Sequence, residues 1–329
     1  MAGATPIGTD VVTSISRRYI VPQIADNVYQ SNLMFHRLNQ SNRRIVQGGY
    51  QIEQPLMYAK MAAGGPYQGY DLLNIAPSDT ILNGAWQWKQ YYSPVTVDGL
   101  TLIKTDAPDA IANFLNIYFA QAEMDLADQL GNGVWSDGVT NTNNIDGLAG
   151  AIDNDGVLTT YGGLSRSTYT WWKSQEDAST TVTSLAAFQA LFGSCTQGGR
   201  HPTIIVGTQA NYNYYYALNT SLQTFPSQPA GQDEQLAQAG FNNLLFNGVP
   251  FAVDSHIVTA PGYVANTTGD VFFINEDFMY LYVSPRANFT LEDFQTAINQ
   301  DAMVAKLLWA GNMVISNCAL QGKFTTLTS

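Results

Sequence analysis

Hydrophobic and polar residues alternate with a period of two on both sides of a glycine-rich stretch near the start of the chain. The first alternation covers residues 50–54, and the second covers residues 86–97, up to a turn signal at Asp98-Gly99. Gly64-Gly65-Pro66 lies between them. The pattern predicts two long strands joined by a Gly- and Pro-rich tip within residues 45–104. A hairpin this long cannot bury both faces alone, so it needs cover from its own body or from a neighbour.

The clearest helical period lies in residues 106–131. Thr105 or Asp106 provides an N-cap, Pro108 suits the first turn and Gly131 follows the last apolar position. One apolar stripe recurs at intervals of three and four residues, and a second apolar set lies off it. The stripe is Ile111, Leu115, Tyr118, Ala122, Leu126 and Leu130, and the second set is Ile117, Phe119 and Met124. A helix with two apolar faces must pack on both sides.

The rest of the chain mixes shorter helices and strands, so the fold class is α+β. We expect helices at residues 185–192 and 208–218, and a buried strand at 202–207. Strand–turn–strand patterns cover residues 246–254 and 271–283, and residues 302–316 read as strand or buried core. The stretch 132–156 is rich in loop residues.

Charge is scarce and mostly negative. Only 12% of the 329 residues are charged and the formal net charge is −12, whereas 18 are tyrosines. An uncharged, aromatic and polar surface suits contact with other proteins and is poorly suited to gripping duplex nucleic acid. The first 50 residues are the exception, with five arginines against two aspartates. This arm is either a solvated face or a segment that lies on an acidic neighbour or a polyanion.

Neither a signal peptide nor an apolar run of membrane-spanning length is expected from the sequence. The two cysteines, Cys195 and Cys318, are expected to be reduced and buried in a cytosolic protein rather than joined.

Residues with catalytic or metal-binding chemistry are few and scattered. His36, His201 and His256 are far apart, and none stands near a cysteine, so a zinc site is not expected. The run from Asp153 to Gly156 starts like a calcium loop, but its glycine stands fourth instead of sixth, so we expect a polar turn. Asp254 ends an apolar strand and is expected to hydrogen-bond a turn. The sequence therefore predicts no catalytic, cofactor-binding or metal-binding residue, and a protein that is not an enzyme.

Clustered aromatic residues leave a second interpretation open. Trp171-Trp172 and the run Tyr214–Tyr216 favour packing, because few cations stand nearby for a nucleic-acid stacking platform. A hydrolase or sugar-binding β protein would instead use Trp86, Trp88, Trp171 and Trp172.

The order of arm, hairpin, long helix and β-rich body resembles the major capsid protein of tailed bacteriophages, which has the Hong Kong ninety-seven fold. Tyr92-Ser93-Pro94-Val95-Thr96-Val97-Asp98-Gly99 resembles the returning strand of that family's extended loop, and residues 109–131 resemble its spine helix. Further similar segments are 147–148, 160–172, 239–254, 273–275 and 300–317. Together they span most of the chain from about residue 45 onward.

The resemblance implies an N-terminal arm (1–44), an extended loop (45–104), a peripheral domain (105–180 and 265–329) with the spine helix at 106–131, and an axial domain (181–264). It implies hexamers and pentamers of this chain in an icosahedral virion shell around double-stranded DNA, assembled in the host cytoplasm. Portal, scaffold and decoration proteins are the further partners, and DNA is contacted weakly. Lys60 and Lys89 lie in the loop region, but no cross-linking pattern matches by position. A nanocompartment shell around protein cargo, as formed by encapsulins, is the alternative.

Overall fold

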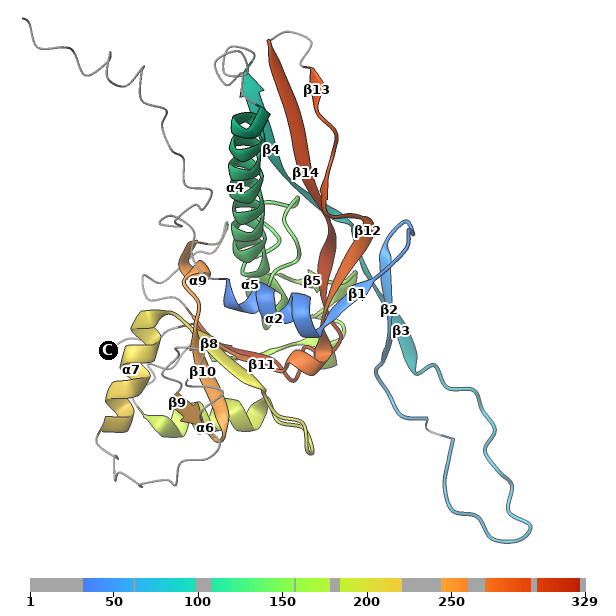
Figure 1. The fold of residues 1–329 in the computed structure, drawn as a ribbon. Helices are drawn as coiled ribbons and strands as arrows, with labels where there is room; N and C mark the ends of the chain where they lie inside the picture. The colour runs from blue at the N-terminus through green and yellow to red at the C-terminus, as the bar shows by residue number, and fades with distance from the viewer. Residues whose placement is uncertain are drawn as a thin grey trace, which may run out of the picture.

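The computed structural model describes residues 32–61, 63–98, 108–156, 158–177, 184–220, 244–259, 270–296 and 301–325 (Figure 1). The helices are α2 (Leu33–Ser41), α4 (Pro108–Val134), α5 (Leu148–Ala151), α6 (Leu185–Ser194), α7 (Gln209–Thr220) and α9 (His256–Thr259), with 3₁₀ turns η1 (Thr170–Trp172) and η2 (Glu276–Phe278). The strands are β1 (Arg43–Ile45), β2 (Ile52–Met57), β3 (Ile81–Trp86), β4 (Lys89–Asp98), β5 (Thr160–Tyr161), β6 (Leu164–Ser165), β7 (Gln175–Asp177), β8 (Ile204–Gly207), β9 (Leu244–Phe246), β10 (Val249–Val253), β11 (Val271–Ile274), β12 (Met279–Leu291), β13 (Gln295–Thr296), β14 (Ala302–Ile315) and β15 (Gly322–Phe324).

A five-stranded sheet of long strands lies beside α4 (Figure 1). Its central strand β14 pairs with β4 on one side and with β12 and β13 on the other. Ser93, Val95 and Val97 of β4 are buried while the residues between them are exposed, as the alternation predicts. The Ser93 hydroxyl donates to Asp125 of α4 at 2.8 Å, which places the buried face of β4 toward the helix.

The long helix lies close to its predicted bounds, because its stripe repeats over many turns. The buried side chains of its second half recur every four residues, at Ala122, Leu126, Leu130 and Val134. The stripe residues before Asn116 lie outside the side chains that the structure describes.

A six-stranded mixed sheet forms a second core, in the order β7-β15-β11-β8-β10-β9. Phe188 of α6 is fully buried there, with ring centroids of Tyr215, Phe246, Phe273 and Phe324 between 5.3 and 5.9 Å away. Cys195 belongs to this core and Cys318 to the core beneath α4, and both are free and buried, as expected. Burial raises the pKa of each thiol to about 12.

The predicted hairpin exists, but its returning strand is not continuous. β2 and β3 pair with each other from Ile52 opposite Trp86 to Met57 opposite Ile81. After Gln87 the chain changes partners, and β4 joins β14 of the larger sheet. The Gln87 carbonyl accepts a hydrogen bond from the Asn312 side chain at 2.8 Å, which fixes this change. The expectation of one long returning strand over 86–97 was therefore wrong.

Most other predicted elements are confirmed. They are α6, β8, α7, the pair β9 and β10, the segments β11 and β12, and β14. The short helix α5 interrupts the stretch expected to be loop. In the part of the chain that the structure describes, no helix is both long enough and apolar enough to cross a membrane.

Candidate functional site

The histidines do not gather into a site. His36 is exposed on α2, His201 stacks on Phe192, and His256 is buried at the start of α9. Among the described residues, no cluster of His, Cys, Asp and Glu side chains has the arrangement to hold a metal ion.

Asp254 hydrogen-bonds a turn, as expected, and it also binds a histidine that the sequence analysis did not connect to it. Its Oδ1 accepts from the backbone N–H of His256 at 3.0 Å and lies 3.0 Å from Nδ1 of that ring. The other ring nitrogen, Nε2, lies 2.9 Å from Oδ1 of Asp128 on α4. Burial lowers the pKa of His256, but the hydrogen bonds and charges of the two aspartates outweigh it, so the net pKa is raised. The histidine ties α9 to α4.

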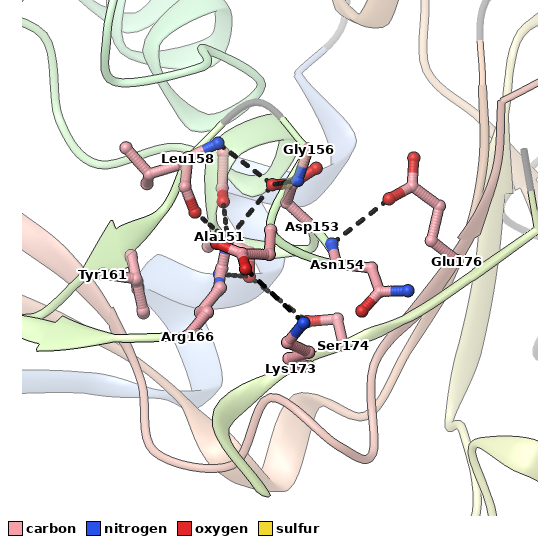
Figure 2. Close-up of polar contacts among 12 residues, drawn as sticks. Ala151, Asp153, Asn154, Gly156, Leu158, Tyr161, Arg166, Lys173, Ser174 and Glu176 are labelled. Atoms are coloured by element: carbon pink, nitrogen blue, oxygen red, sulfur yellow. Dashed lines mark hydrogen bonds and ion pairs between the residues drawn. The ribbon is translucent and has the colours of Figure 1, made fainter. Parts of the chain in front are cut away.

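Asp153 lies in a polar turn, as expected, and two buried cations face it, Lys323 and Arg166. Figure 2 shows Asp153 with Arg166. Oδ2 of Asp153 accepts from the N–H groups of Gly156 and Leu158 at 3.0 Å. Arg166 lies 3.5 Å and Lys323 3.4 Å from the same carboxylate. We call Asp153, Arg166 and Lys323 the buried ion cluster; it joins β15 to the segment after β6.

The arginines of the arm are partly used within the chain. Arg37 makes a double hydrogen bond to Glu276, at 2.7 and 2.8 Å. The guanidinium of Arg44 lies 3.6 Å from the ring centroid of Tyr280. Arg37 is therefore paired within its own chain, which leaves the contact of this segment with an acidic neighbour or a polyanion a prediction. Arg17 and Arg18 lie outside the described residues.

Two of the four tryptophans considered for sugar binding have no open face, whereas Trp88 and Trp171 are half-buried. Trp86 and Trp172 are fully buried, and Trp171 packs against Tyr58 at a ring distance of 5.8 Å. Tyr215 is also buried and stacks on Phe251, as the packing interpretation expects. A sugar site built on Trp86 and Trp172 is excluded, because neither ring has a free face.

The loop tip, which we define as residues 58–80 between β2 and β3, exposes large apolar side chains that packing within the chain does not account for. It projects away from the body (Figure 1). Tyr70 and Leu72 are fully exposed and Ile75 is 90% exposed. Large exposed apolar residues of the tip and its flanking strands are Met57, Met61, Tyr67, Tyr70, Leu72, Leu73, Ile75 and Ile81. Scattered exposed apolar residues are ordinary, but so many on one projection mark an interaction surface.

A second surface lies on the long-strand sheet. A pocket of about 410 Å³ opens between β4, β12 and β14. Its lining residues are Gln90, Tyr91, Tyr92, Ala287, Lys306, Leu308, Trp309 and Ala310. The pocket forms where the pairing register of β12 with β14 shifts between Val283 and Asn288, so that Ala287 stands off the ladder. Tyr92 remains 62% exposed at its rim.

Comparison with known proteins identifies the fold. No family model and no curated protein matches the sequence. Among solved structures, a chain of the cyanophage A-1(L) capsid asymmetric unit is 15% identical with a TM-score of 0.68, over 96% of this chain and 98% of that one. A chain of the capsid of a native GTA particle is 11% identical with a TM-score of 0.58, over 96% and 97% of the two chains.

The SrpI encapsulin from Synechococcus elongatus PCC 7942 is 8% identical with a TM-score of 0.55, over 99% of both chains. At these identities the comparisons establish the fold and not the activity. The predicted α+β fold, that of Hong Kong ninety-seven-like phage capsid proteins, is confirmed.

Proposed function

We propose that this chain is the major capsid protein of a tailed phage, which self-assembles into hexamers and pentamers of an icosahedral shell around double-stranded DNA. The observation that carries the proposal is the loop tip, whose large apolar side chains between Met61 and Ile75 are exposed on the single chain, on a fold shared with shell proteins. The chain would assemble in the host cytoplasm and reside in the virion capsid.

The loop tip supplies the driving force for assembly in this proposal. Burying a Leu, Ile or Met side chain that was exposed contributes about 1.5–3 kcal/mol. Several such side chains per copy, repeated at every contact of a closed shell, stabilise it strongly although each contact is weak. The pocket beside Tyr92 lies on a part of the body that a neighbouring tip can cover, and we propose it as one receiving surface.

The division into an arm (1–44), an extended loop (45–104), a peripheral domain (105–180 and 265–329) and an axial domain (181–264) remains a proposal. In its support, α6, α7 and β8 to β10 gather on the six-stranded sheet, whereas α4 lies on the long strands. Strands β7, β11 and β15 of the peripheral ranges complete the six-stranded sheet, so the two parts share a continuous backbone ladder.

We further propose that the chain acts without catalysis and touches packaged DNA weakly. The net charge of −12 repels a polyanion, which keeps the genome from adhering to the wall. Arg43 is exposed on the arm and is the described arm arginine best placed for a phosphate. Portal, scaffold and decoration proteins are the further partners in this proposal.

A nanocompartment shell is the second candidate, favoured by the encapsulin among the similar structures. Expression of the chain alone, followed by electron microscopy and size-exclusion chromatography, tests both. Closed hollow particles support a shell protein. A compact monomer at high concentration contradicts it. Particles isolated with double-stranded DNA from the native source favour the capsid, and particles filled with enzyme favour the nanocompartment.

A further inference from the structure

The base of the hairpin is fastened to its own body by three buried side chains, of which Trp86 is the largest; the other two are Ile52 and Leu56 of β2. Trp86 ends β3 and is 1% exposed, and its ring meets Tyr161 edge-on at a centroid distance of 5.6 Å. Beside it, the N–H of Ala85 donates to the carbonyl of Gly162 at 2.9 Å. A two-stranded hairpin is marginally stable alone, so contacts with the body such as these are needed to hold it.

The turn between β5 and β6 is shaped around that ring. Gly162 and Gly163 have φ values of +59° and +75°, as a two-residue hairpin turn requires. A Cβ on Gly162 would stand 2.5 Å from the Trp86 ring, whereas a Cβ on Gly163 would meet nothing within 4 Å. Within the hairpin, a Cβ on Gly84 would also stand 2.5 Å from the Trp86 ring. The indole therefore fills its site with no space left beside either glycine.

The turn is itself held rigidly. The Tyr161 carbonyl accepts from the indole N–H of Trp172, and its hydroxyl accepts from the N–H of Ile315. Arg166, just after β6, belongs to the buried ion cluster and donates to the carbonyl of Gly150. It also donates to the carbonyl of Leu158 (Figure 2). The Trp86 ring thus meets a surface with little freedom to move.

A second contact lies where the loop tip begins. Tyr58 stacks on Trp171 of the body, and its hydroxyl donates to the Asp79 carbonyl at 2.8 Å. Beyond this point the tip leaves the body (Figure 1).

We propose that the turn between β5 and β6 is a socket for Trp86, and that this socket sets the direction in which the loop tip leaves the body. Trp86, Gly84 and Gly162 are positioning residues. Their consequence for assembly rests on the proposed function. A loop tip that is held away from its own body presents its apolar side chains to another copy. Because the hairpin is already ordered before contact, binding loses less conformational entropy.

The test measures the direction of the loop within one chain. Spin labels go on Gln68→Cys in the tip and Ala190→Cys on α6, both exposed, while Cys195 and Cys318 stay buried. Labelled chain is diluted into unlabelled full-length chain, so that pulsed electron paramagnetic resonance reports one intrachain distance whether or not particles form. Gly162→Ala is expected to shift and broaden the distance distribution and to lower the yield of particles.

Gly163→Ala is the matched control, because it carries the same turn strain without meeting the Trp86 ring. It is expected to keep the original distance distribution. In the double variant Gly162→Ala with Trp86→Phe, the smaller phenyl ring leaves room for the added methyl group. We expect this variant to recover part of the narrow distance distribution of the unmodified chain. Should Gly162→Ala not fold, Gly84→Ala carries the test, since its backbone has no positive φ.

The socket proposal is contradicted if Gly162→Ala leaves the distance distribution unchanged, or if Gly163→Ala changes it equally. The outcome is separable from the proposed function. If the unmodified chain forms no particles at all, the capsid proposal fails while the distance still decides whether the socket aims the loop.

Discussion

The Nε2 atom of His256 lies 2.9 Å from Oδ1 of Asp128, although the two residues are 128 positions apart in the chain. With Asp254 at 3.0 Å from the other ring nitrogen, the imidazole stands between two carboxylates. The backbone N–H of Met34 approaches the same Asp254 carboxylate at 3.4 Å, which brings α2 to this point as well. The raised pKa of His256 makes the contact dependent on pH.

We expect the free energy of unfolding to fall as the pH rises above the ordinary histidine value of 6.5. Because the folded-state pKa of His256 is raised, its contribution is fully present below 6.5 and is lost as the pH passes through the folded-state pKa. His256→Gln should flatten this dependence and destabilise the chain by about 3 kcal/mol, since it leaves Asp254 buried without its cation. Urea unfolding at several pH values measures both effects. His36→Gln, exposed on α2, is the control, and equal slopes in both variants would sink the prediction.

Deleting residues 62–81 is expected to leave a soluble, folded chain that does not close shells. A smaller change is the double variant Leu72→Ser with Ile75→Ser. It should change the free energy of unfolding by less than about 0.5 kcal/mol, because both side chains are exposed in the single chain. The same pair should sharply reduce particle yield in electron micrographs. Thr142→Ser, at an exposed position on the body, is the control. Normal particles from the deletion would contradict the role given to the loop.

Replacing the pocket's exposed rim residue should also impair assembly. Tyr92→Ser removes a ring that is 62% exposed in the single chain, so its cost to folding is small. Its cost to assembly should be large if a neighbour covers the pocket. Comparing the melting temperature with the particle yield separates the cost to folding from the cost to assembly. Glu292→Gln serves as the reference, because Glu292 directly follows β12 and is exposed. Equal yields from both variants would remove the pocket from the interface.

Breaking the buried ion cluster should be costly. Arg166→Met leaves Asp153 with one cation and frees the carbonyls of Gly150 and Leu158, so we expect a loss of about 3–5 kcal/mol. Lys173→Met removes a cation from a pair with Asp155 that is more exposed than the buried ion cluster, and it should cost less than about 1 kcal/mol. Chemical denaturation of the two variants compares them directly. Similar losses would mean that burial does not control the strength of these pairs.

Local patterns made the elements predictable. The helix α4 carries its apolar stripe in one continuous stretch, and the alternation of Ser93, Val95 and Val97 predicted β4. Gly131 did not end the helix as predicted, since α4 continues to Val134, and the N-cap candidates Thr105 and Asp106 lie outside the described residues. The need of the hairpin for cover, from its own body or from a neighbour, also followed from its length. The exposed tip agrees with that reasoning.

Long-range partners could not be predicted in the same way. Nothing near Gln87 signals that β3 and β4 belong to different sheets, because the period of two is the same in both. Trp86 and Gly162 are 76 positions apart, and only the folded chain shows that one fills the space left by the other. The contact between His256 and Asp254 could have been predicted, because the two residues are two positions apart. The contact between His256 and Asp128 could not, because no local pattern connects residues 128 positions apart.

The central claim is that the loop tip is bare on the single chain and covered by another copy in the shell. Hydroxyl-radical footprinting of Met61, Tyr67 and Tyr70 tests it most directly, because Met and Tyr side chains report their own exposure. The account predicts strong oxidation of all three in the dispersed chain and marked protection in intact particles. Equal oxidation in both states, or protection already present in the dispersed chain, would contradict it.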